Sequence, residues 1–187
     1  GNKRFTSARI YQPGISFTAD GTPYVFFTDN SQSNKPTVMK YSSGTWSVVG
    51  ERGYGDAMNT SVGSDFTILE DGTVFTFYQQ NAAGGGVSRR ALNMASFSGN
   101  WNANNTIPGM PAVSGTTNAV YNPRAVAHNN TLYVTMTLNG TGYGLYKYEN
   151  NAWNTLSNGF LPEGASGINI RDLSIATDPE GIPYLAI

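Results

Sequence analysis

Charged and phenolic side chains recur at the start of several short runs that have the composition of β-strands. Carboxylates, guanidinium groups and phenols at such matching places can form salt bridges with one another or hold a polar ligand by hydrogen bonds. If these runs converge in the fold, their first residues converge with them. We therefore predict a ligand-binding site, with a purely structural salt-bridge network as the alternative, at these residues: Arg124, Arg171, Asp172, Asp65, Tyr11 and Tyr121.

The same sequence gives little support for catalysis. The chain has twelve acidic residues, one histidine (His128) and no cysteine. We therefore expect no Ser–His–Asp arrangement, no thiolate nucleophile and no histidine or cysteine metal cluster. A sialidase-type site would need three arginines around a carboxylate, and no motif assigns that role to Arg9, Arg124 and Arg171. We expect binding rather than catalysis, with no catalytic residue, metal or cofactor.

Composition narrows the possible partners and the location. The 187 residues carry a net charge of −1, and only 12% of them are charged. Nothing in this pattern builds the basic stripe that nucleic-acid binding needs, so we expect no nucleic-acid partner. No apolar run approaches the roughly 18 residues of a membrane span, so we expect no membrane insertion. A low-charge chain rich in Asn, Gly, Ser, Thr and Tyr is typical of an extracellular, cell-surface or periplasmic bacterial protein.

The strongest pattern is an internal repeat. A turn residue and a tryptophan each recur at a spacing of 51–58 residues, and a spacing that holds at two markers is unlike chance. The turn residues are Gly21, Gly72, Asn130 and Gly181, and the tryptophans are Trp46, Trp101 and Trp153. The repeat predicts units at about 11–50, 64–102, 121–158 and 170–187, the last one incomplete.

Each unit reads as four short strands. Runs rich in β-branched and aromatic residues are bounded by Gly, Asn, Asp and Pro, and no segment keeps a helical period. A four-stranded antiparallel unit of this length is the blade of a β-propeller. We predict an all-β chain that forms part of one propeller, with about three and a half four-stranded blades. A closed ring needs about four to eight blades, so further blades or a second chain should complete it. The alternative is a β-sandwich.

The aromatic residues are predicted to be mainly structural. A tryptophan at the same point of every unit should pack between blades, with its N–H bonded to a loop, although stacking on a sugar is the alternative. The aromatics of each second strand should lie in the core. These are Tyr24, Phe26, Phe75, Phe77, Tyr133 and Tyr184.

The first unit resembles a known group of repeats. The pattern DGTPYV…KYSSGTWSVVG is similar to the repeats of bacterial extracellular β-propellers of the kelch and sialidase-like (Asp-box) kind. The segment 42–46 resembles the end of the Asp-box but lacks its aspartate, and the kelch glycine doublet is missing from the second strand. The resemblance implies the propeller architecture and says little about activity.

These observations favour one function over two others. We predict a non-catalytic extracellular module that recognises a glycan or a surface protein through the loops at the propeller rim. One alternative is a glycoside hydrolase or sialidase-like enzyme whose active site is only partly contained in this chain. The other alternative is a structural repeat segment of an adhesin. A pocket with two carboxylates about 5–10 Å apart would favour the enzyme.

Overall fold

The computed structural model describes residues 6–80, 92–110, 120–138, 142–160 and 173–187, and these form three four-stranded antiparallel sheets and one two-stranded sheet. We call each sheet a blade. Blade 1 consists of β1 (Ile10–Phe17), β2 (Pro23–Asp29), β3 (Lys35–Ser42) and β4 (Thr45–Val48). Blade 2 consists of β5 (Ser64–Ile68), β6 (Val74–Gln79), β7 (Leu92–Phe97) and β8 (Trp101–Asn105). Blade 3 consists of β9 (Val120–His128), β10 (Thr131–Leu138), β11 (Gly142–Glu149) and β12 (Ala152–Phe160). Half-blade 4 consists of β13 (Ser174–Thr177) and β14 (Pro183–Ala186).

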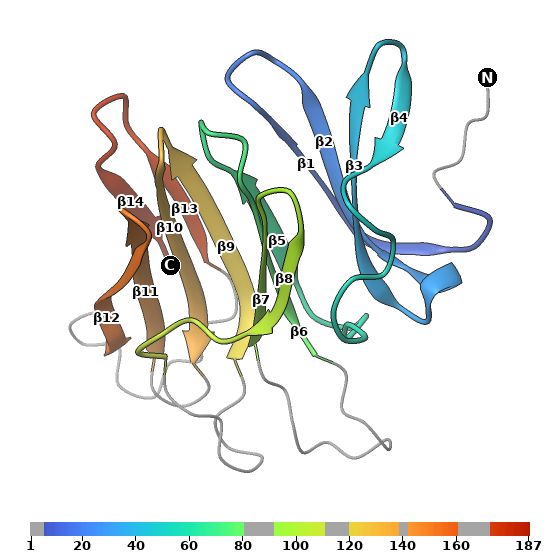
Figure 1. The fold of residues 1–187 in the computed structure, drawn as a ribbon. Coiled ribbons are helices and arrows are strands. Elements are labelled where there is room, and N and C mark those ends of the chain that lie inside the picture. Colours follow the sequence, from blue (N-terminus) through green and yellow to red (C-terminus); the bar gives the residue numbers. More distant parts are fainter. Residues whose placement is uncertain (1–5, 81–91, 111–119, 139–141, 161–172) are drawn as a thin grey trace.

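The all-β prediction is confirmed. In the described part of the chain the one helical element is a 3-10 turn, η1 (Asn30–Gln32). Strands within each sheet follow the chain order, so strands that are consecutive in the chain are antiparallel neighbours in the sheet. Figure 1 shows the sheets standing side by side, from blue through green and orange to red. None of the described helices is long and apolar enough to cross a bilayer.

The first turns of blades 1 and 2 and of half-blade 4 share the same pair of backbone hydrogen bonds. In blade 1 Thr18 N donates to Thr22 O and Gly21 N donates to Thr18 O, at 3.1 and 2.9 Å. The turns 69–73 and 178–182 contain the same pair of bonds. Each has glycine at its fourth position, with φ between 82 and 86°, a conformation that side chains disfavour. Blade 3 uses a tighter turn of two asparagines instead, which is why its turn marker is not a glycine.

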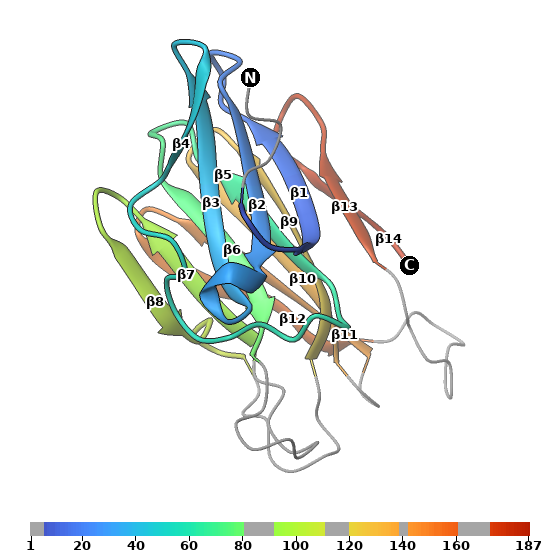
Figure 2. The same cartoon turned by 90° about the vertical axis from the view of Figure 1, so that its right-hand side faces the viewer.

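Apolar faces of successive blades pack against each other and form the core. Blade 2 packs against blade 1 with one face of its sheet and against blade 3 with the other. Figures 1 and 2 show the sheets standing in a row. Between blades 1 and 2 the cluster includes Phe26, Val38, Phe66, Ile68 and Tyr78. Between blades 2 and 3 it includes Phe75, Phe77, Leu132, Val134 and Tyr146. Blade stacking therefore supplies the burial that one isolated sheet lacks.

The tryptophans of blades 2 and 3 lie in these joints, as predicted. Trp101 Nε1 donates to the carbonyl of Val49 at 2.9 Å, and the indole stacks on Tyr54 at 3.5 Å between ring centroids. Trp153 meets Phe75 and Phe77 of blade 2 edge-on, at 6.2 and 6.4 Å. A structural role thus holds for both of these residues.

The prediction for the second-strand aromatics is correct for four of them. Phe26, Phe75, Phe77 and Tyr133 are buried, and Tyr24 is partly buried. For Tyr184 the prediction is wrong, because 60% of this residue is exposed. It lies on the face of half-blade 4 that no described blade covers. Burial of a propeller aromatic depends on the next blade as well as on its own strand.

Candidate functional site

The innermost strands follow one another around the interior, because β1 contacts β5, β5 contacts β9, and β9 contacts β13. This arrangement places Asp65 and Arg124 on neighbouring strands. Asp65 Oδ2 accepts the backbone N–H of Ala125 at 2.8 Å, and Asp65 Oδ1 accepts that of Phe66 at 2.9 Å. The carboxylate therefore joins blade 2 to blade 3 through a charge-assisted hydrogen bond.

Arg124 is held by a bulge in β9. Asn122 has a φ of 47°, and its Oδ1 accepts the N–H of Gly63 at 2.9 Å. Directly after the bulge, the Arg124 guanidinium donates to the carbonyl of Pro123 at 3.0 Å. Blade 1 repeats the bulge at Gln12, whose φ is 50° and whose Nε2 donates to the carbonyl of Asn59 at 3.3 Å. The first link joins β9 to the residue directly before β5 of blade 2, and the second joins β1 to the connector that leads from blade 1 to blade 2.

The other predicted ligand-binding residues are not placed beside this pair by the described contacts. Tyr11 lies on β1 next to Arg9, whose guanidinium carbon is 5.8 Å from the centre of the phenol ring. The backbone of Tyr121 pairs with Thr137 in blade 3, but its side chain lies outside the description. Arg171 and Asp172 also lie outside the described residues. The six-residue site therefore remains a prediction. Of its six residues, the structure places Asp65 and Arg124 on neighbouring strands.

Burial raises the pKa of Asp65, and the two backbone hydrogen bonds and the positive charge of Arg124 oppose that rise. The folded protein therefore binds more protons than the unfolded chain between the ordinary carboxyl pKa, about 4, and the raised value. The stability contributed by this group is fully present below pH 4 and is lost as the pH rises through the raised pKa. Asp65→Asn should remove that decline, as unfolding curves recorded from pH 4 to 7 would reveal.

Two further variants test this assignment. Asp65→Ala leaves the Ala125 N–H without its acceptor and should lower the free energy of unfolding by about 1–3 kcal/mol at every pH. Asp20→Asn is the sign control, because a hydrogen bond from the Thr18 hydroxyl lowers the pKa of Asp20. Its stability contribution is present above the ordinary pKa and is lost as the pH falls. If the free energy of unfolding depends on pH in the same way for wild type and Asp65→Asn, the Asp65 carboxyl group does not have the raised pKa that its burial implies.

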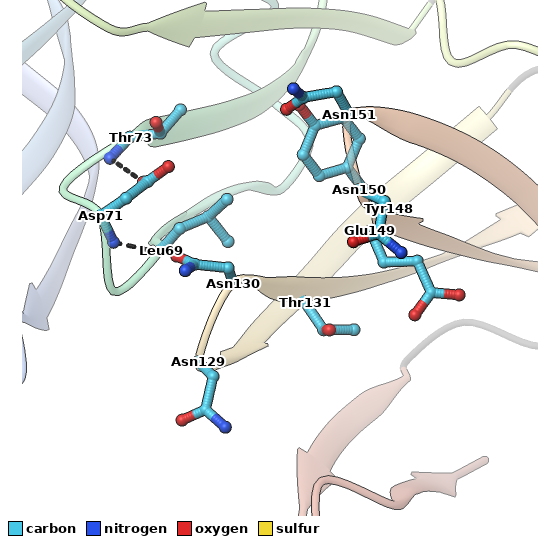
Figure 3. Close-up of a pocket in the computed structure, with 10 residues that line it drawn as sticks. All are labelled: Leu69, Asp71, Thr73, Asn129, Asn130, Thr131, Tyr148, Glu149, Asn150 and Asn151. Carbon is cyan, nitrogen blue, oxygen red and sulfur yellow. Dashed lines mark hydrogen bonds between the residues drawn. The ribbon is translucent and has the colours of Figure 1, made fainter.

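A second site is a pocket where three hairpin turns meet (Figure 3). The β5–β6 turn of blade 2 supplies one wall, and the β9–β10 and β11–β12 turns of blade 3 supply the rest. The pocket has a volume of about 460 Å³, within the range of small-molecule sites. Its lining residues are Leu69, Asp71, Thr73, Asn129, Asn130, Thr131, Tyr148, Glu149, Asn150 and Asn151.

Hydrogen bonds between the turns make the pocket rigid. Glu70 N donates to the carbonyl of Asn129 at 3.0 Å, and Asp71 N donates to Asn130 Oδ1 at 2.9 Å. Asp71 Oδ1 accepts the N–H of Thr73 at 2.8 Å, which fixes the direction of its carboxylate. The turns of blades 2 and 3 are therefore locked together before any ligand arrives, which reduces the entropy lost on binding.

The far wall of the pocket combines an aromatic ring with polar groups. The Tyr148 hydroxyl donates to Asn151 Oδ1 at 3.2 Å, and its ring packs on Phe75 and Trp153 at 4.9 and 5.2 Å. Figure 3 shows Tyr148 and Asn151 facing the turn that carries Asp71. Nearby, the Glu149 carboxylate lies 2.6 Å from Lys147 Nζ and raises the pKa of that ammonium group. The pocket thus presents hydroxyl, amide and carboxylate groups around part of an aromatic ring.

The sequence did not single out this pocket. The β5–β6 turn lies more than 50 residues along the chain from the two blade 3 turns at 129–131 and 148–151, and each turn alone has the ordinary Asn/Asp/Gly chemistry of a hairpin. The one available signal was the cluster of asparagines at 129–130 and 150–151, which fills two turns of the same blade. Among the described residues, no group of three or more acidic, histidine or cysteine side chains could hold a metal ion.

Comparisons with known proteins concern the fold. No family model matches the chain, and a comparison with curated protein sequences gives no match. Solved structures do match. A mutant of the Aleuria aurantia lectin in complex with Fucα1-6GlcNAc is 14% identical, with a TM-score of 0.54, and the match covers 92% of this chain and 52% of that chain.

Two other structures agree. The six-bladed β-propeller structure of the Aleuria aurantia lectin is 15% identical with a TM-score of 0.55, and the match covers 89% of this chain and 49% of that chain. An α-L-arabinofuranosidase from Lactobacillus brevis is 10% identical with a TM-score of 0.50, over 94% of this chain and 64% of that chain. The chain spans about half the length of the lectins that it matches. It is a β-propeller chain with about three and a half blades.

Proposed function

We propose that this chain is a non-catalytic carbohydrate-binding module and that the pocket between blades 2 and 3 is a sugar site. The observation that carries the proposal is the pocket itself, which is rigid, polar and of monosaccharide-compatible size at about 460 Å³. A sugar ring carries several hydroxyl groups that each donate and accept hydrogen bonds. The amide and carboxylate groups of Asn130, Asn151 and Asp71 offer both kinds of partner.

The ring of Tyr148 adds the second element of sugar recognition. It is half-buried, and its contacts with Phe75 and Trp153 hold it in one orientation. The C–H face of a sugar can pack on such a ring while its hydroxyl groups reach the asparagines. A single small pocket gives modest affinity, and repetition of similar blades would raise it through multivalency.

The structural neighbours support the proposal by analogy. Two are lectin structures described by their complex with a fucosylated sugar or by their fucose recognition. By this analogy, we propose that the ligand of the module is a glycan rather than a protein. We also propose that the module is extracellular. The kelch and Asp-box resemblance of the first unit belongs with the same proposal, since the repeats that it resembles are those of bacterial extracellular β-propellers.

Removing one pocket side chain tests the site. Asn151 has a φ of 60°, so Asn151→Gly keeps the turn conformation while it deletes the amide. We expect at least an approximately tenfold weaker binding of α-methyl-L-fucoside or of the best glycan from an array, measured by titration calorimetry. Ser43→Gly, at the matching turn of blade 1 with a φ of 51°, is the control and should bind normally.

Two results would contradict the proposal. If the wild-type chain binds no glycan on the array, carbohydrate recognition is excluded at the concentrations tested. If Arg124→Ala abolishes binding while Asn151→Gly leaves it unchanged, the sugar lies at the inner strands rather than in the pocket. An adhesin segment with a purely structural role would give the first of these results.

Glycoside hydrolysis is the second candidate, because the pocket contains the carboxylates of Asp71 and Glu149 on different turns. Two carboxylates facing one sugar are the minimum for a glycosidase. Both are engaged already, since Asp71 accepts the N–H of Thr73 and Glu149 pairs with Lys147. Release of 4-nitrophenol from an α-L-arabinofuranoside or α-L-fucoside, abolished by Glu149→Gln, would favour the enzyme over the lectin.

A further inference from the structure

The charged side chains at one end of the blades are mostly acidic. The turns that join the first strand of a blade to the second, and the third to the fourth, lie at this end, as Figure 1 shows. The acidic residues at or beside these turns are Asp20, Glu70, Asp71, Glu149, Asp178 and Glu180, and the basic ones are Lys40 and Lys147. A surface with an excess of one sign of charge attracts ligands of the opposite sign and repels those of its own.

The pocket between blades 2 and 3 lies within this acidic end. Its described lining residues include the carboxylates of Asp71 and Glu149 and no basic side chain. The Lys147 ammonium group lies 2.6 Å from the Glu149 carboxylate, so those two charges are already paired. Side chains alternate along a strand, so Lys147 and Glu149 project from the face of β11 opposite to that of Tyr148. The charge on the Tyr148 side of the pocket is therefore negative and comes from Asp71.

The Asp71 carboxylate is oriented by its own turn and keeps one oxygen for a ligand. Its Oδ1 accepts the N–H of Thr73 at 2.8 Å, and the matching Asp20 of blade 1 accepts the N–H of Thr22 at 3.0 Å. Asp71 Oδ2 accepts no hydrogen bond from any described residue. An ionised carboxylate oxygen is an acceptor only, so its best partner is a cationic donor.

The Tyr148 ring faces the turn that carries Asp71 across the pocket (Figure 3). Its contacts with Phe75 and Trp153 hold the ring, and its hydroxyl group is used in the hydrogen bond to Asn151. The face of an aromatic ring attracts an ammonium group through its quadrupole. A carboxylate on one side and an aromatic ring on the other are together the chemistry that binds an organic ammonium ion.

We propose that, among sugars, this pocket prefers those that carry a free amino group and disfavours those that carry a carboxylate. The inference rests on the proposed function, because it concerns which sugar occupies the pocket. The ammonium group of an amino sugar lies between the Asp71 carboxylate and the Tyr148 ring, and the sugar hydroxyl groups bond to the asparagine amides. N-acetylation removes the positive charge, and a uronic acid brings a negative charge into a negative field.

Titration calorimetry with matched methyl glycosides tests the preference. The probes are glucosamine and galactosamine, their N-acetylated forms and the corresponding uronic acids, at about pH 6, where amines are protonated and carboxylates are ionised. Each amino sugar should bind at least about fivefold more tightly than its N-acetylated form, the combined effect of one exposed ion pair and one cation–π contact. Each uronic acid should bind more weakly than both. Salt at about 1 M should reduce these differences, because the screening length falls to about 3 Å.

One substitution separates charge from shape. Asp71→Asn keeps an oxygen for the Thr73 N–H but removes the negative charge, so the affinity ratio of the amino to the N-acetylated sugar should fall to near one. Asp20→Asn makes the same change in the same kind of turn of blade 1, outside the pocket. It is the matched control and should leave the ratio as in wild type.

The outcomes distinguish this inference from the proposed function. If the amino and N-acetylated sugars bind equally, or if Asp71→Asn leaves their affinity ratio unchanged, the charge preference is wrong and the sugar site stands. The same holds if the wild-type chain binds α-methyl-L-fucoside but none of these probes. If no sugar binds at all, both the preference and the proposed function fail.

Discussion

Replacing Trp101 with alanine is expected to lower the free energy of unfolding by about 3–5 kcal/mol, the range for removing a large aromatic side chain from a core. Trp101 belongs to blade 2 but bonds to Val49 beyond the last strand of blade 1, and it stacks on Tyr54 in the connector between the blades. The substitution therefore opens a cavity in the joint and leaves a carbonyl without its donor. Urea unfolding followed by circular dichroism measures the loss.

Two variants separate the contributions of this residue. Trp101→Phe keeps a ring for Tyr54 to stack on but removes the N–H, and it should cost only about 1 kcal/mol from the hydrogen bond plus a modest packing loss. Trp46→Ala, the same position of the repeat in blade 1, should cost clearly less than Trp101→Ala in dilute solution, because no described blade lies against Trp46. Equal losses at the two positions would mean that each tryptophan stabilises only its own sheet.

The sequence was sufficient to predict the sheets because the repeat is local. Turn chemistry at positions such as Gly21 and Gly72 and the alternation of strands are properties of a few neighbouring residues, and the structure repeats the same turn bonds in three units. Burial was less predictable. The connector 51–62 consists mostly of polar residues and glycine, yet Tyr54 and Met58 within it are almost fully buried in the joint between blades 1 and 2.

Sites that depend on separate segments were the part that sequence reasoning could not reach. Asp65 and Arg124 were predicted to converge because they begin equivalent strands, and strand order alone brings those together. The pocket needs the turn carrying Asp71 to meet turns carrying Asn130 and Asn151, and no periodicity encodes that contact. Tyr184 illustrates the same point for burial. Its strand has the composition of a core strand, but the residue is exposed because no described blade covers that face of half-blade 4.

Gly50→Ala is the second substitution with a large expected effect. Gly50 has a φ of 68°, and a Cβ atom built there would lie 2.7 Å from Phe97 Cε2 and 2.7 Å from Trp101 Nε1. A left-handed alanine costs about 1–2 kcal/mol, and overfilling a packed joint costs about 1–3 kcal/mol more. We expect a loss of about 2–5 kcal/mol in the free energy of unfolding, measured by urea denaturation.

The control is Gly44→Ala in the β3–β4 turn. Gly44 has a φ of 82°, but a Cβ atom there would meet nothing within 4 Å, so only the backbone cost of about 1–2 kcal/mol applies. The difference between the two variants isolates the steric cost of pushing Trp101 out of the joint. If Gly50→Ala and Gly44→Ala lower the free energy of unfolding equally, Trp101 can move away from the added methyl group without loss. The joint between blades 1 and 2 is then not the tightly packed contact that its geometry indicates.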